Sequence, residues 1–293
     1  MHNLLEKTVT LLAWAMTAML VLVVCLFVGY LLVKGLPALG TRLVFGEAAV
    51  LPALLGQARV FDGLLPAIVG TVVLVILAVS LATPVGVCSG IFLAEYAGPG
   101  TKRIFGLFFD ILAGIPSIVI GLFGFSVALF LHKYFSSRLG PCLLISALSL
   151  AFLVLPYIIR STQAALESLP GNTRYTGLAL GASKLQNIVY VLIPRALSGI
   201  GSGIVLAIGR CAEDTAVIML TGVVAIAGIP SSLLAQYEAL PFYIFYISNQ
   251  YSNQAELAKG YGACLILLVI CAVMFLTAYL IKKQVTFRTL YRV

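Results

Sequence analysis

Charged side chains are scarce in this sequence. Only 10% of the 293 residues are Asp, Glu, Lys or Arg, whereas 61% are hydrophobic. A globular domain in water is typically about 45–50% apolar and about 25% charged, because polar groups must cover its surface. The shortage of charge therefore excludes an ordinary water-soluble domain and indicates that lipid is the solvent. We predict an all-α, polytopic membrane protein.

Residues that build metal, redox and nucleotide sites are few or badly spaced. The two histidines, His2 and His132, lie far apart, and the six cysteines lie in apolar segments without CxxC spacing. The ATP-binding pattern GxxxxGKS or GxxxxGKT is absent, and its nearest imitation, AGPGTKR at 97–103, has the wrong glycine spacing. An integral-membrane enzyme would need a cluster of His, Asp or Glu at the membrane surface, and none is found. We predict no metal, no cofactor, no catalytic residue and no ATPase site in this chain.

Long apolar runs recur along the chain, and each reaches the length of about 18 residues that a membrane-crossing helix needs. The first run is too long for the apolar core of a signal peptide and lacks a clear cleavage site, so we expect it to stay as a helix. The six predicted spans are 8–33, 64–83, 114–131, 142–159, 196–223 and 258–281.

The distribution of basic residues predicts the orientation of these spans. Six spans place both termini on one side, and the segments on that side hold the larger share of Lys and Arg. Cytoplasmic loops carry such an excess, so we predict cytoplasmic N- and C-termini in the cell inner (plasma) membrane. The net charge of +8 is then a membrane feature rather than a sign of nucleic-acid binding.

Three stretches next to the predicted spans have compositions that predict structure at the membrane interface. Pro84 is followed by VGVCSGIFLAEYAG, for which we predict a short interfacial helix. The stretch TKRIFGLFFDILAGIP predicts an amphipathic lead-in that ends near Pro116. The outer segment 224–257 is rich in Tyr, Phe, Asn and Gln, which fits either an aromatic belt at the membrane interface or a docking surface.

One apolar stretch, AIGRCAEDTAVIML at 207–220, contains Arg210, Glu213 and Asp214. A charge at the bilayer centre costs about 2.5–3.5 kcal/mol, so intramembrane charges usually have a function. The spacing of three and four residues lets all three charges share one face of a helix. The hypotheses are a translocation path, a purely structural ion pair and a gating latch. A stripe of small residues precedes the charges and predicts close helix packing: Gly199, Gly203, Ala207 and Cys211.

Residues 174–194, RYTGLALGASKLQNIVYVLIP, alternate between apolar and polar positions at helical spacing. Gly181 interrupts the pattern, because glycine costs about 1 kcal/mol in a helix interior. We expect a helix–Gly–helix element at the cytoplasmic surface rather than a seventh span. From the residues alone, it could equally be a simple amphipathic surface helix.

This stretch resembles the EAA loop of ABC importer permeases. Gly181 falls on the glycine of that motif, Val191 on its Ile, Ile193 on its Leu and Pro194 on its Pro, whereas 175–177, Tyr-Thr-Gly, replaces the Glu-Ala-Ala triplet. In that family the loop forms a coupling helix that docks on the cytoplasmic ATPase. The residues assigned to coupling by this resemblance are Arg174, Tyr175, Gly177, Gly181, Ala182, Lys184 and Pro194.

Four further stretches resemble the phosphate importer permeases of the PstA family, which are type I permeases with the MetI-like fold. These stretches are PVGVCSGIFLAEYAG, FFDILAGIPSIVIGLFGF, LAIGRCAEDTAVIMLTG and LPFYIF followed by AELAKG, and they appear in the family's order. The resemblance implies an N-terminal helix with an external loop at 1–63, a transporter domain at 64–283 with its coupling loop at 160–195, and a cytoplasmic tail at 284–293.

The same resemblance implies the function and the partners. The expected function is half of the translocation path for inorganic phosphate, and the alternative is a permease for another oxyanion such as sulfate, molybdate or phosphonate. The expected partners are a second, PstC-like permease, a dimer of PstB-like ATP-binding subunits that hydrolyse ATP, a PstS-like phosphate-binding protein outside the cell, phosphate, and membrane lipid.

The side chains of the charged stretch at 207–220 are chemically suited to an oxyanion such as phosphate. The planar guanidinium of Arg210 suits the oxygens of phosphate, and a neighbouring carboxylate keeps the affinity weak enough for release. A carboxylate also offers a hydrogen-bond acceptor for the proton of hydrogen phosphate, which sulfate lacks at neutral pH. Asp214 stands where the family has its glutamate. We therefore assign Arg210, Glu213 and Asp214 to the transport path, and place Asp110, which also resembles a family acid, near its cytoplasmic mouth.

Overall fold

A computed structural model describes residues 2–48, 63–135 and 140–290 of the chain, and every long element in this part is a helix. Six helical stretches are long and apolar enough to cross a membrane, which confirms the predicted number of spans and the all-α class. The external loop predicted within 1–63 lies mostly outside the described residues. The helices are α1 (His2–Gly35), α2 (Thr41–Phe45), α4 (Leu65–Glu95), α5 (Pro99–Gly114), α6 (Ser117–Tyr134), α7 (Leu143–Glu167), α8 (Gly171–Ala179), α9 (Lys184–Asn187), α10 (Ile193–Glu213), α11 (Ala216–Thr221), α12 (Leu240–Gln250) and α13 (Gln254–Leu290).

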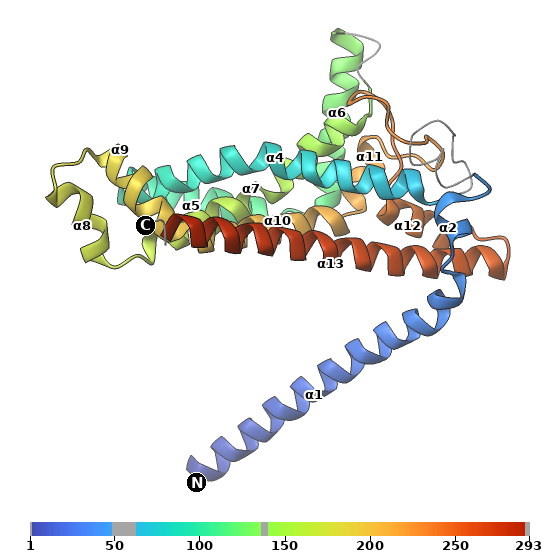
Figure 1. Ribbon diagram of the computed structural model, residues 1–293, viewed down its shortest axis with the longest axis horizontal. Coiled ribbons are helices and arrows are strands. Elements are labelled where there is room, and N and C mark those ends of the chain that lie inside the picture. Colours follow the sequence, from blue (N-terminus) through green and yellow to red (C-terminus); the bar gives the residue numbers. More distant parts are fainter. Residues whose placement is uncertain (1, 49–62, 136–139, 291–293) are drawn as a thin grey trace.

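Helix α7 is the centre of the bundle. It packs against α4 on one side and α10 on another, and α13 packs against α10, so these helices run side by side along the long axis (Figure 1). Leu150, Val154 and Ile158 of α7 are fully buried. Small residues make the contacts close, because glycines of α4 and α10 face α7 directly. Such backbone approach is what holds helices together in lipid, where the hydrophobic effect does not.

Two helices leave this bundle. Helix α1 diverges from it (Figure 1) and touches α13 only near its end, where the hydroxyl oxygens of Tyr30 and Tyr261 lie 3.2 Å apart. Helix α6 projects on the other side and packs at its base on α11. The apolar side chains along α1 are exposed, which is the expected state of a helix whose solvent is lipid.

Helix α4 does not stop at Pro84, so the predicted short interfacial helix after that residue is wrong. The helix continues to Glu95. A proline removes one backbone hydrogen bond from a helix. Here the residues that follow Pro84 continue to pack against α7. Gly86 lies against Ile158 of α7, and Gly90 lies against Thr162 one turn further on. Tertiary packing therefore overrides the helix-breaking signal.

The predicted span at 196–223 is not one helix either. Helix α10 ends at Glu213, and a separate short helix, α11, follows after Asp214 and Thr215. At its other end, α10 begins earlier than predicted, because α9 runs into it through a π-helical turn at Ile188–Leu192. The amphipathic lead-in is correct: α5 ends at Gly114, and Pro116 precedes α6.

The segment between α11 and α12 folds back against α4. The Tyr237 side chain is fully buried, and the backbone N–H of Leu240 donates to the Thr71 hydroxyl at 2.9 Å. The buried Glu238 carboxylate accepts from the backbone N–H groups of Ala227 (3.0 Å) and Gly228 (2.8 Å). Burial raises the pKa of this carboxyl, and the two N–H groups partly offset the effect. The segment is therefore anchored to the bundle.

Adding one methyl group at the α4–α7 contact should destabilise the protein. A Cβ at Gly90 would lie 2.6 Å from Cβ of Thr162 and 2.9 Å from the carbonyl oxygen of Ile159. Overpacking of this kind costs about 1–3 kcal/mol, so Gly90→Ala should lower the midpoint of thermal unfolding in detergent. The matched control is Gly29→Ala in α1, where a Cβ meets nothing within 4 Å. Equal midpoints for the two variants would show that the close contact is not required.

Candidate functional site

The charged pair at the end of α10 is formed by Arg210 and Glu213. Nη1 of Arg210 donates to Oε1 of Glu213 at 2.7 Å, one helical turn apart. The two side chains are 39% and 63% exposed, so the pair lies on an open flank of α10. Nε of Arg210 is buried and has no hydrogen-bond partner among the residues that the structure describes. The Nε–H is thus shielded inside the protein, and the accessible part of the guanidinium is the part that pairs with Glu213.

Asp214 does not share the helical face of this pair, contrary to the expectation that all three charges would. Helix α10 ends just before it, and its backbone is extended. The residue is buried, with 6% of its surface exposed, and Oδ1 accepts from the backbone N–H of Val217 at 2.8 Å. Asp214 lies just before Thr215, the N-cap residue of α11, and its side chain caps the first turn by the kind of contact that aspartate favours at helix starts. An aspartate directly before an apolar helical run is a recognisable start signal, and the sequence contained it.

The small-residue stripe packs inside this chain. Gly199 lies against Ala165 of α7, and Gly203 lies against Ser161 of the same helix. Ala207 is fully buried in the main core cluster. The stripe thus fixes α10 on α7 and leaves the Arg210–Glu213 pair on the flank beside it.

Asp110 lies elsewhere, on α5, and pairs with Arg160 of α7. Nε of Arg160 donates to Oδ1 of Asp110 at 3.2 Å, and Nη2 donates to the same oxygen and to the Gly106 carbonyl, the latter at 2.7 Å. The pair clamps the amphipathic helix α5 onto the bundle. Sequence reasoning missed Arg160 as a partner, although a basic residue just beyond a predicted span is a place to look for one.

The stretch 174–194 has the predicted helix–Gly–helix form. Helices α8 and α9 are joined through Gly181, whose φ of +84° lies in the left-handed region that glycine tolerates best. Ala182 N–H donates to the Gly177 carbonyl at 3.0 Å, and Ser183 and Gln186 form a capping box at the start of α9. Pro194 lies in the first turn of α10.

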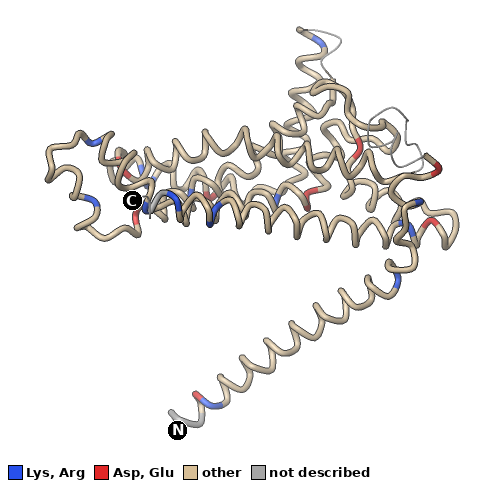
Figure 2. Tube along the Cα trace, viewed as in Figure 1, with Lys and Arg blue, Asp and Glu red and all other residues tan. Residues whose placement is uncertain are grey.

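Asn187 clasps the two halves of this element together. Its Nδ2 donates to the Arg174 carbonyl at 2.7 Å, and its Oδ1 accepts from the Gly177 N–H at 3.2 Å. The element lies at one end of the bundle, beside the carboxyl end of α13 (Figure 1), and Lys and Arg residues gather at that end (Figure 2). Its exposed apolar side chains are Tyr175, Leu178, Leu180, Leu185, Val189 and Tyr190. This combination of rigidity and exposed apolar surface suits a protein contact.

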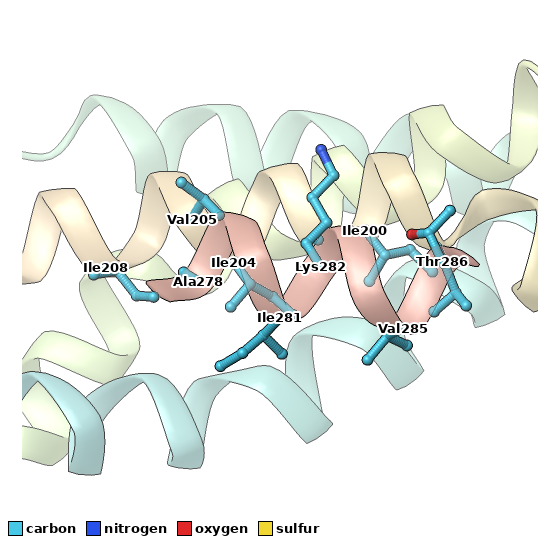
Figure 3. A pocket seen from close by; sticks show the side chains of 11 residues that line it. Ile200, Ile204, Val205, Ile208, Ala278, Ile281, Lys282, Val285 and Thr286 are labelled. Carbon is cyan, nitrogen blue, oxygen red and sulfur yellow. The ribbon is translucent and has the colours of Figure 1, made fainter. Parts of the chain in front are cut away.

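A groove of about 290 Å³ runs between α10 and α13 (Figure 3). Its walls are almost wholly aliphatic, and Nζ of Lys282 donates to the Ser202 hydroxyl at 2.7 Å. Such a lining suits apolar contact and does not suit an oxyanion. Among the described residues, no three His, Cys, Asp or Glu side chains are grouped as a metal ion would require. The groove is lined by Leu197, Ile200, Gly201, Ile204, Val205, Ile208, Ala278, Ile281, Lys282, Val285 and Thr286.

Comparison with known proteins places these features in context. Residues 86–287 match the family described as binding-protein-dependent transport system inner membrane component. The chain is 31% identical to the phosphate transport system permease protein PstA of Haemophilus influenzae, with 89% of this chain and 88% of that protein covered. It is 32% identical to the protein PstA 1 of Mycobacterium tuberculosis, with 77% of this chain and 72% of that protein covered.

The fold also resembles solved structures. An inward-facing conformation of the MetNI methionine ABC transporter contains a chain that aligns with a TM-score of 0.58, at 17% identity, over 76% of this chain and 95% of that one. At this identity the likeness establishes the fold alone.

The cap at Asp214 predicts a difference between two substitutions. Asp214→Ala removes the acceptor for the Val217 N–H and should lower the free energy of unfolding by about 1–2 kcal/mol. Asp214→Asn keeps an oxygen at the same place and should retain most of the stability. Thermal unfolding in detergent measures both, with Glu213→Ala as the control for loss of a neighbouring acid. Equal stability of Asp214→Ala and Glu213→Ala would contradict the capping role.

Proposed function

The chain belongs to the family of binding-protein-dependent transport system inner membrane components, and we propose that it is one permease half of an ATP-driven phosphate importer. The substrate is supported by relatives named as phosphate transport permeases that align over most of the chain. These names favour phosphate over sulfate, molybdate or phosphonate. The geometric observation that carries the proposal is the Arg210–Glu213 ion pair, which is partly exposed on the flank of α10.

In this proposal Arg210 gives phosphate a transient contact. The guanidinium fork suits an oxyanion, and the exposed part of the Arg210 side chain is where the anion would make contact. Glu213 competes for the same guanidinium, so the anion binds weakly and can leave, as a conducting path requires. Its carboxylate can also accept a hydrogen bond from the P–O–H group of hydrogen phosphate. Asp214 contributes by ending α10, which leaves Arg210 in the last turn of the helix. Asp110 stays a prediction for the cytoplasmic mouth, held there by Arg160.

The α8–α9 element is the proposed contact with the ATPase. Its support is the exposed apolar surface on a rigid helix–Gly–helix frame at a basic end of the bundle. That end would be cytoplasmic, together with both termini. We further propose that a second permease completes the path and that a binding protein delivers phosphate from the opposite side. The proposed organisation keeps the N-terminal helix at 1–63 and the tail at 284–293 outside the transporter domain at 64–283.

Loss of the arginine donor should impair uptake strongly. Removing one charge-assisted hydrogen bond costs about 1.5–3 kcal/mol, so Arg210→Ala should reduce phosphate uptake about ten- to a hundredfold. Arg210→Lys keeps the charge without the fork and should retain part of the uptake. Radiolabelled phosphate uptake in cells lacking other phosphate transporters measures the effect, with membrane levels checked by blot.

The control for Arg210 is Arg42→Ala, which removes an arginine from another short-range ion pair, with Glu47, on the exposed surface. It should transport like the parent. If Arg210→Ala is inserted normally and also transports like the parent, the charges on α10 have a structural role only.

The backbone at Gly181 gives a second test, of the coupling element. A non-glycine residue in the left-handed backbone conformation costs about 1–2 kcal/mol of stability, and asparagine adopts that conformation more readily than other non-glycine residues. A Cβ at Gly181 meets nothing within 4 Å, so any effect comes from the backbone rather than from a clash. Gly181→Val should therefore lower uptake while ATP hydrolysis by the assembled complex continues, and Gly181→Asn should be milder. Normal uptake by Gly181→Val would argue against a coupling role for this turn.

A further inference from the structure

The carboxyl end of α4 collects basic side chains from three other elements. A helix end leaves carbonyl groups without partners and carries partial negative charge, so cations are favourable there. Nζ of Lys102, on α5, donates to the Ala94 carbonyl at 3.1 Å, and Nζ of Lys184, on α9, donates to the Glu95 carbonyl at 2.6 Å. Nη2 of Arg174, on α8, lies 3.2 Å from Oε1 of Glu95. Contacts from α5, α8 and α9 therefore converge on the last two residues of α4, Ala94 and Glu95.

The Glu95 carboxylate is enclosed but loosely held. Its side chain is 11% exposed, and Oε1 is buried without an accepted hydrogen bond among the described residues, although Arg174 is in ion-pair contact. The same Arg174 nitrogen donates to the Leu166 carbonyl of α7 at 2.7 Å. Arg174 therefore bridges the ends of α4 and α7 with a single nitrogen. A carboxylate shielded from water depends strongly on the cation in direct contact with it, which here is Arg174.

Both helices of the α8–α9 element contact the carboxyl end of α4. Arg174 ties α8, and Lys184 ties α9, where its ammonium also lies 4.4 Å from the ring centroid of Tyr96. The element itself contains no acid, because residues 168–194 include neither Asp nor Glu. The carboxylate that holds it comes from α4 instead. From Glu95, α4 runs without interruption to Leu65 and packs along α7.

We propose that Glu95 is a positioning residue that transmits force between the α8–α9 element and the membrane bundle. This inference rests on the proposed function. A push or pull by the ATPase on α8–α9 reaches α4 through the Glu95–Arg174 ion pair, and reaches α10 directly through the helical connection from α9. The ion pair makes α4 follow the movement of α10. Without it, α8–α9 stays linked to the end of α4 only through the bond from Lys184 to the Glu95 carbonyl, so α4 follows the movement less closely and less phosphate is carried per ATP.

The test uses the complete transporter, that is, this chain with its partner permease, ATPase pair and binding protein, reconstituted in proteoliposomes. ATP hydrolysis and phosphate uptake are measured in the same preparation for Glu95→Gln, Arg174→Gln and the double variant. Each single change should lower the phosphate moved per ATP about threefold or more, within the range of measured coupling energies. The double variant should be no worse than the poorer single one, because both remove one interaction.

The matched control is Glu47→Gln, which breaks an exposed ion pair with Arg42 at a similar nitrogen–oxygen distance, 3.0 Å, and should leave the ratio unchanged. An unchanged ratio in Glu95→Gln and Arg174→Gln would overturn the inference, as would independent effects that multiply in the double variant. If Glu95→Gln fails to assemble, the result for Arg174→Gln tests the inference alone, because Arg174 lies on the α8–α9 element rather than in the bundle. A wild-type complex that hydrolyses ATP but moves no phosphate would overturn the proposed function, and this inference with it.

Discussion

The structure depends on close packing of two helices against α7. Gly86 and Gly90 bring α4 onto one side of α7, and Gly199 and Gly203 bring α10 onto another. In lipid there is no hydrophobic drive between helices, so van der Waals contact at short range must hold them. The positions of the other features follow from this contact, because the Arg210 pair, the cap at Asp214 and the end of α4 are all set by where α4 and α10 lie.

The α8–α9 element and the Arg210–Glu213 pair lie at opposite ends of α10. Helices α4 and α10 both reach the α8–α9 element, α4 through its last residue and α10 through an unbroken helical connection. Helix α10 then carries the Arg210–Glu213 pair in its last turn. A displacement of α8–α9 therefore has a short, rigid route to the proposed phosphate contact. The fold joins an ATPase-facing surface to a charged path without needing a flexible connection between them.

The sequence was informative where apolarity or backbone geometry decides the structure. The six spans follow from apolar length, and the turn at Gly181 follows from a glycine inside a helical pattern. Helix boundaries predicted from the sequence were wrong where contacts between helices determine the structure. Pro84 suggested a helix end because proline lacks an N–H, but the glycines that follow it pack on α7 and keep α4 continuous. The break after Glu213 was hidden because its flanks are apolar on both sides, although Asp214 is a good cap. The partners of Asp110 and Arg174 could not be read from the sequence, because they come from helices far away along the chain.

The central claim is that the Arg210–Glu213 flank of α10 faces a water-filled route for phosphate. The most direct test is labelling of Glu213→Cys, in a chain whose natural cysteines are replaced, by an anionic thiol reagent that does not cross membranes. Leu22→Cys, on the exposed and apolar α1, is the lipid-facing control. We predict that position 213 reacts in the assembled transporter, that phosphate slows the reaction and that position 22 stays unlabelled. An unreactive position 213, or a reaction that phosphate does not slow, would contradict the account.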